Sequence, residues 1–147
     1  MQPKILFGVA LAIALSVIPV RAESPQNTTA IAGVWRGTVR STQNRPAPIV
    51  LDVKPALLGE SAGTIAWGKP YTCASGLELA DVGGLDGTQT YYLSLASGNG
   101  GYCDTIRDGQ VELTTLSAGT LRFVVLPPKG TSALHDTTVK KDPPRKN

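Results

Sequence analysis

The sequence predicts an all-β fold, a single antiparallel small β-barrel or β-sandwich of about eight short strands with one disulfide. Runs rich in Val, Leu, Ile and Thr recur between Gly, Pro, Asn, Asp and Ser, and several alternate apolar and polar residues as half-buried strands do. The chain of 147 residues contains 16 glycines and 11 prolines, and no stretch carries a helical stripe, which argues against long helices. The pattern alone leaves barrel and sandwich open.

Eight short runs carry the strand pattern, and turn residues separate them. In the first run Gly33 and Gly37 flank Trp35, whose indole either plugs one end of a barrel or serves as an ordinary large core residue. Between the sixth and seventh runs, Arg107-Asp108-Gly109 is a strong hairpin signal. The expected strands are 34–40, 49–53, 63–67, 77–82, 90–95, 102–106, 110–116 and 121–126.

Residues 1–22 have the features of a secretory signal peptide. Lys4 supplies the positive start, residues 5–20 are mostly apolar, and Val20 and Ala22 are the small residues expected before a cleavage site. The alternative is a membrane anchor, but the apolar run is shorter than the ~20 residues of a spanning helix. A cleaved signal peptide implies a periplasmic or extracellular protein without a membrane span.

The rest of the chain is expected to form one domain between two unstructured ends. Residues 23–30 are polar and without periodicity, which predicts a flexible lead-in to a β-domain at 31–126. Pro127 and Pro128 stop the last expected strand. Residues 127–147 contain few apolar groups and an excess of lysine and arginine, so the sequence predicts a disordered basic tail.

The charges of the chain argue against a nucleic-acid partner. The 14 basic residues fall to 12 once the signal peptide, which contains Lys4 and Arg21, is removed, and they stand against 11 acidic residues. Nucleic-acid binding needs a basic face on the folded body. Here the basic excess lies in the expected tail.

Cys73 and Cys103 are the two cysteines of the chain. Because export places them in an oxidising compartment, they are expected to form one disulfide, and two separate buried thiols are the alternative. Closing a loop of this length would stabilise the fold by about 3–4 kcal/mol. Two cysteines and one distant histidine are too few ligands for a zinc site.

No combination of residues predicts catalysis, a metal site or a cofactor. The single histidine, His135, falls in the expected tail and could not hold the geometry of a catalytic triad there. Glu78 and Asp81 would point to opposite faces of a strand, and Asp108 lies in a turn, so solvated surface acids explain them. The chain is therefore expected not to be an enzyme.

Three resemblances arise from these residues. A recurring pattern resembles that of small exported bacterial β-domains of unknown function, some of which are similar to extracytoplasmic ends of serine/threonine kinases; this resemblance implies the fold and the disulfide without an activity. The pattern consists of Gly33-x-Trp35-x-Gly37, Gly63-Thr-Ile, Cys73-x-x-Gly76-Leu77-x-Leu79, Gly101-x-Cys103-Asp104, Val111-x-Leu113 and Leu121-x-Phe123.

The other two resemblances concern shorter stretches. Gly33-x-Trp35 on a first strand is similar to lipocalins and avidins, which implies a closed barrel with an internal ligand. The stretch from Ser94 to Tyr102 resembles a loop of periplasmic lysozyme inhibitors of the membrane-bound and C-type classes, which implies an inhibitor.

The sequence therefore predicts an exported, non-catalytic binding or interaction module whose partner is a protein or a glycan. The alternatives are a lysozyme-inhibitor-like protein and a small-ligand carrier with a lipocalin- or avidin-like barrel. Loops that combine Gly, Asn and Ser with aromatic residues suit binding, because they join adaptable polar contacts to aromatic anchors. The expected interaction surface consists of Trp67, Lys69, Tyr71, Ser97, Asn99 and Tyr102.

Overall fold

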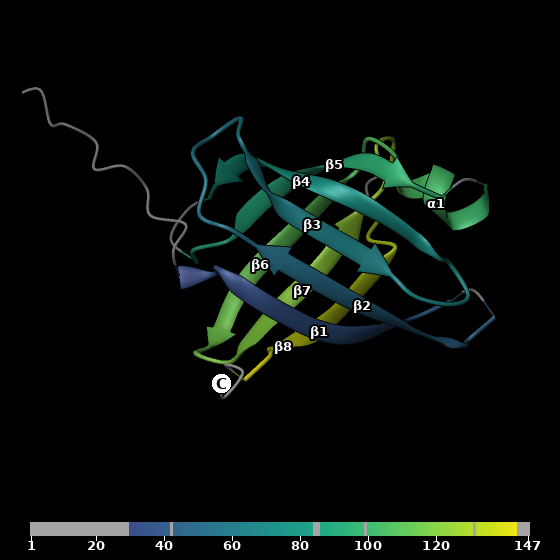
Figure 1. Cartoon of the computed structure of the whole chain (residues 1–147), viewed down its shortest axis with the longest axis horizontal. Coiled ribbons are helices and arrows are strands. Elements are labelled where there is room, and N and C mark those ends of the chain that lie inside the picture. Colours follow the sequence, from purple (N-terminus) through teal and green to yellow (C-terminus); the bar gives the residue numbers. More distant parts are fainter. Residues whose placement is uncertain (1–29, 42, 84–85, 99, 131, 144–147) are drawn as a thin grey trace, which may run out of the picture.

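The chain folds into one closed barrel of eight antiparallel strands (Figure 1). The computed structural model describes residues 30–41, 43–83, 86–98, 100–130 and 132–143, so the expected signal peptide and most of the expected lead-in lie outside the described residues. The elements are β1 (Gly33–Arg40), β2 (Pro46–Val53), β3 (Ser61–Trp67), β4 (Cys73–Val82), β5 (Gln89–Ser97), α1 (Gly101–Ile106), β6 (Gln110–Ser117), β7 (Thr120–Leu126) and β8 (His135–Lys141). The predicted all-β fold is confirmed, and the closure is that of a barrel.

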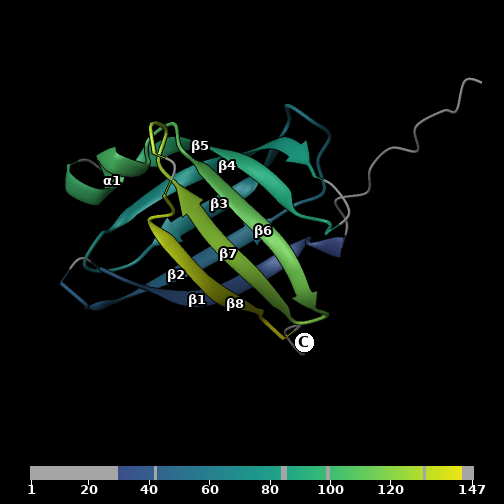
Figure 2. The ribbon, with the colours of Figure 1, turned by 180° about the vertical axis from the view of Figure 1, so that it is seen from behind.

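Each strand pairs with its neighbours in chain order, and β8 returns to pair with β1 (Figures 1 and 2). Alternate connections therefore meet at the same end of the barrel. We call the end that contains the described residues 41, 43–45, 68–72, 98, 100–109, 127–130 and 132–134 the loop end. The opposite end, where β1 begins, is called the tryptophan end after Trp35.

The segment expected to be a strand at 102–106 is instead the short helix α1. Its two buried side chains, Cys103 and Ile106, stand three residues apart, the spacing of one helix face. The side chain of Asp104 accepts a hydrogen bond of 2.9 Å from the backbone N–H of Gly100 and holds the start of the helix. The guanidinium of Arg107 reaches back to Asp104 at 2.8 Å.

The prediction of a disordered tail at 127–147 is wrong for β8. This strand pairs with β7 from Val125 to Thr120 and with β1 from Trp35 to Gly37. Val139 is its fully buried residue. A single apolar position in a charged segment does not produce the alternating pattern of a strand. The strand forms because pairing on both sides satisfies its backbone. The same pairing leaves neither β1 nor β7 with an open edge.

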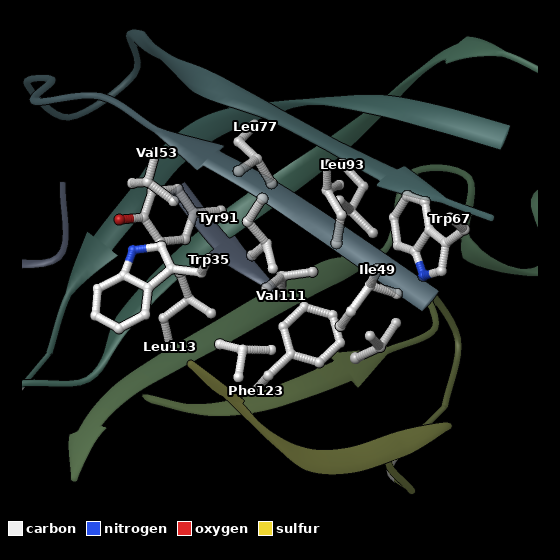
Figure 3. Close-up of a cluster of buried hydrophobic side chains, with 14 of the residues drawn as sticks. Trp35, Ile49, Val53, Trp67, Leu77, Tyr91, Leu93, Val111, Leu113 and Phe123 are labelled. Carbon is white, nitrogen blue, oxygen red and sulfur yellow. The ribbon is translucent and has the colours of Figure 1, made fainter. Parts of the chain in front are cut away.

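The inward-facing side chains of the strands fill the barrel. Figure 3 shows Trp35 and Tyr91 toward one end of this buried cluster and Trp67 at the other, with Val111 and Phe123 between them. Trp35 is 1% exposed, and its indole N–H donates a 2.8 Å hydrogen bond to the carbonyl of Ile31. Trp35 is therefore a large core residue near one end of the barrel, and Ile31, just before β1, satisfies its indole.

Gly37 leaves no room for a side chain between β1 and β8. A Cβ atom at this position would lie 2.7 Å from Cγ1 of Val139 and 3.0 Å from the carbonyl oxygen of Thr138. Such distances are too short for a real contact, so a side chain here would push β8 away. Glycine at this position lets β8 close the barrel.

Replacing Gly37 with Ala should destabilise the protein by about 1–3 kcal/mol, because the added methyl group overpacks the β1–β8 seam. Adding Val139→Ala removes Cγ1, so the double variant should lose less stability than the sum of the two single variants. Urea unfolding measures all three, with the exposed neighbour change Thr38→Ala as control. Strict additivity of the two changes would show that the seam is not tightly packed.

Candidate functional site

A cluster of four rings lies at the loop end of the barrel, and it contains Trp67, Tyr71, Tyr102 and His135. The rings of Tyr71 and Tyr102 are stacked with centroids 3.8 Å apart and planes 19° apart. Trp67 meets Tyr102 edge-on at 6.1 Å, and His135 lies 5.3 Å from Tyr102. We call this group the aromatic cluster.

Three separate segments supply these rings. Trp67 is the last residue of β3, and Tyr71 follows in a tight turn where its N–H donates to the carbonyl of Gly68 at 3.0 Å. Tyr102 lies in α1, and His135 begins β8. The cluster therefore depends on barrel closure, which brings β8 to this end.

The predicted disulfide between Cys73 and Cys103 is confirmed, and it fixes the aromatic stack. Cys73 stands two residues after Tyr71, and Cys103 is next to Tyr102, so the bond joins the two segments that carry the stacked rings. Gly98 allows this approach, because a Cβ atom there would lie 2.5 Å from Cβ of Cys73. Gly98 also has a φ of 87°, a conformation that favours glycine.

Three polar atoms of the aromatic cluster are buried without partners. Among the described residues, four buried side-chain polar atoms have no hydrogen-bond partner, and three of them are Nε1 of Trp67, the hydroxyl of Tyr102 and Nε2 of His135. The fourth is the hydroxyl of Ser75, on the inward face of β4. Buried polar groups are normally paired, so such a concentration marks an incomplete site.

The tryptophan end shows the opposite state. There the indole of Trp35 is paired with Ile31, and the hydroxyl of Tyr91 donates to Oε1 of Gln89 at 2.6 Å. Each end of the barrel thus has one buried tryptophan and one tyrosine with a buried hydroxyl. The pair at the tryptophan end is satisfied within the protein, and the pair at the loop end is not.

Burial shifts the pKa values of the titratable side chains in the cluster. It raises the pKa of Tyr102 well above the usual value, and the Tyr71 ring adds to this rise. The nearby Trp67 indole lowers the pKa of Tyr102 somewhat, although the contact lacks the geometry of a hydrogen bond. Burial also lowers the pKa of His135 and raises that of Tyr71. All three side chains are therefore held in their neutral forms near neutral pH.

Two hollows open beside the cluster. The first, which we call the groove, has a volume of about 330 Å³. The second, which we call the basic hollow, has a volume of about 600 Å³, and Pro70 lines both. The groove is lined by Ser41, Gln43, Pro70, Tyr71, Tyr102, Thr105 and Leu134, and the basic hollow by Arg45, Pro46, Lys69, Pro70 and Thr72.

The structure brings together part of the expected interaction surface. Trp67, Tyr71 and Tyr102 are in the aromatic cluster, and Lys69 is exposed in the basic hollow. Ser97 is exposed at the end of β5, and Asn99 lies outside the described residues. Tyr102 packs inward under the groove and does not form the tip of a protruding loop.

Several residues at this site were not expected from the sequence. His135 was assigned to the tail, and its place in the cluster follows from the pairing of β8 with β7. Gln43 and Arg45 belong to the β1–β2 turn, and Thr105 and Leu134 come from α1 and the β7–β8 connection. Nothing in their local sequence signals a shared site, because they meet only through the barrel topology.

Comparisons with known proteins give no relative: no family model, curated protein sequence or solved structure matches the chain. Within the described residues, no three His, Cys, Asp or Glu side chains are grouped so that they could hold a metal ion. Among the same residues, the structure contains no helix with the length and apolar character needed to cross a bilayer. The case for a role therefore rests on the geometry of the loop end.

Replacing both Cys73 and Cys103 with Ser should lower the free energy of unfolding by about 3–4 kcal/mol, because the bond closes a loop of 30 residues. The strands should still form, because their pairing does not require the bond. Urea unfolding followed by circular dichroism measures both effects, and reduction of the unaltered protein should reproduce them. A loss below about 1 kcal/mol would mean that α1 stays docked without the bond.

Stability should also depend on His135 as the pH falls below the usual histidine pKa of 6.5. Its pKa is lowered in the folded protein from the usual 6.5, so the unfolded chain binds a proton more readily. The free energy of unfolding should therefore fall as the pH drops through 6.5 and stay level above that value. His135→Phe keeps a ring and should flatten the curve. An unchanged slope in this variant would place the titration elsewhere.

Proposed function

We propose that the chain is an exported, non-catalytic binding module that holds its ligand at the loop end, in the groove above the aromatic cluster. The observation that carries the proposal is the difference between the two ends of the barrel. Polar atoms of Trp67 and Tyr102 are buried without partners beside a groove, whereas those of Trp35 and Tyr91 are paired within the protein.

The composition of the groove supports binding of one small portion of a ligand. Its volume of about 330 Å³ is at the lower limit of ligand pockets, which measure about 300–1,000 Å³. Tyr71, Pro70 and Leu134 provide apolar surface, while Gln43 and Thr105 are exposed and offer an amide and a hydroxyl. Such a lining, with a few polar groups among apolar ones, is typical of small-molecule sites.

The filled interior supports a ligand at the mouth of the barrel and not inside it. The side chains of Ile49, Leu93, Val111 and Phe123 are buried and occupy the middle of the barrel (Figure 3). A barrel of eight strands has an interior just wide enough for side chains to fill or for one small ligand. These core residues occupy the middle of the interior, which favours a surface module over an internal carrier.

The absence of a catalytic role is supported by the surroundings of His135. It faces Tyr71 and Tyr102, and Nε2 has no partner among the described residues. The neighbouring Asp136 points outward and pairs with Arg122, so it does not orient the imidazole. Export is supported by the apolar start of the sequence and by the disulfide, because disulfides persist in oxidising compartments.

The proposal is tested by titrating ¹⁵N-labelled protein with saccharide oligomers and short peptides, one at a time. A ligand in the groove should shift the indole N–H signal of Trp67 and leave that of Trp35 unchanged. Tyr71→Ala should weaken binding by at least about tenfold, because buried tyrosine contacts often dominate binding.

Tyr92→Ala is the matched control, because Tyr92 is an exposed tyrosine on β5 and does not line the groove. It should bind like the unaltered protein. A ligand whose affinity falls equally in both variants, or that shifts the Trp35 signal alone, would contradict the proposed site.

A further inference from the structure

We infer that the groove and the basic hollow form one composite site for an acidic saccharide, a sugar chain that carries carboxylate groups. The inference rests on the proposed function and names its ligand class. Pro70 lines both hollows, so they are neighbours on the surface, and the inferred ligand would reach across Pro70 from one to the other. The groove would take an uncharged sugar ring, and the basic hollow would take the carboxylate.

The lining of the groove fits a sugar ring. None of the residues that line it carries a formal charge. The aromatic face of Tyr71 is electron-rich and suits the C–H groups on one face of a pyranose. Gln43, Ser41 and Thr105 supply an amide and two hydroxyls that can exchange hydrogen bonds with sugar hydroxyls.

The basic hollow supplies the charge complement. Arg45 and Lys69 both line it, and both are exposed. Neither forms an ion pair with any residue that the structure describes. An arginine guanidinium can bind a carboxylate with two parallel hydrogen bonds, and a lysine adds a second positive charge.

The charges of the connections at the loop end also favour a negatively charged ligand. The connections at this end contain four basic residues and two acidic ones, and one of the acids, Asp104, is already paired with Arg107. The connections at the tryptophan end contain one basic residue and two acidic ones. The connections of the loop end therefore offer a negatively charged ligand more basic than acidic side chains.

The barrel topology disfavours an extended acidic peptide. Such peptides commonly bind by adding a strand to an exposed sheet edge. In the described barrel every strand pairs on both sides, because β8 joins β7 to β1. The site is built from side chains of loops, which suits a ligand recognised through its own hydroxyl and carboxylate groups.

The test compares an α-1,4-linked trigalacturonate with its methyl ester by calorimetry on the full exported chain. The ester has the same sugar rings and replaces each carboxylate with an uncharged methyl ester. The acid should bind about five- to tenfold more tightly than the ester at low salt, the range expected for two exposed charge contacts. The difference should shrink as salt is added, because exposed charges are screened.

Variants separate the two parts of the site. Arg45→Gln combined with Lys69→Gln should remove the preference for the acid and leave binding of the ester unchanged. Lys129→Gln is the matched control, because Lys129 is a cation of the β7–β8 connection that lines neither hollow. Tyr71→Ala should weaken both sugars to a similar degree.

Equal binding of acid and ester would overturn the inference, as would no binding of either sugar. Binding of an acidic peptide such as oligoglutamate, with neither sugar bound, would also overturn it. If an uncharged sugar or a peptide shifts the Trp67 indole signal and loses affinity in Tyr71→Ala, the proposed function stands while the acidic saccharide is rejected. If no ligand of any class affects Trp67, both fail.

Discussion

Closure of the barrel by β8 is the constraint on which the rest of the structure depends. This strand contributes a single fully buried side chain, Val139, yet it pairs with β7 and with β1. Its main role is to satisfy the backbone of its neighbours, because an unpaired strand edge invites aggregation. Closure at eight strands also sets the barrel diameter, and at this diameter the core side chains fill the interior.

Because buried side chains occupy the middle of the barrel, its two ends are the places where a ligand could bind. The two ends differ in whether their buried polar atoms are hydrogen-bonded. At the tryptophan end, residues before β1 fold over Trp35, and every buried polar atom of Trp35 and Tyr91 finds a partner. At the loop end, the six-residue helix α1 covers the barrel. A helix this short is not stable by itself, so the disulfide to Cys73 and the burial of Ile106 hold it in place.

The sequence predicted the parts of the fold that repeat a local pattern. Seven strands follow from alternation and turn residues, and the disulfide follows from two cysteines in a chain that the sequence predicts to be exported. Helix α1 could not be predicted because it has only two apolar residues on its buried face, Cys103 and Ile106. A single three-residue spacing is too short to reveal a helical pattern. Strand β8 was missed because its stability comes from pairing on both sides, which no local pattern reveals. Closure into a barrel is likewise a non-local property.

The candidate site could be predicted only where aromatic residues drew attention to it. Trp67, Tyr71 and Tyr102 were grouped because large aromatic side chains near glycine-rich loops suit binding, and the structure places them in one cluster. His135 lies in the segment that the sequence predicts to be disordered. Only the pairing of β8 with β7 brings it beside the other three rings. Gln43 and Arg45 follow β1 as ordinary turn residues, and the barrel alone brings them beside Tyr71.

The position of the disulfide has an energetic reason. A buried polar atom without a partner costs about 1–3 kcal/mol, and the aromatic cluster contains three of them. The disulfide stabilises the folded chain by about 3–4 kcal/mol, an effect of comparable size, and it joins the two segments that carry Tyr71 and Tyr102. The covalent bond therefore offsets a local cost that hydrogen bonds remove at the tryptophan end. The rings of Tyr71 and Tyr102 that the bond holds in place line the groove, so the disulfide also fixes the surface that a ligand would contact.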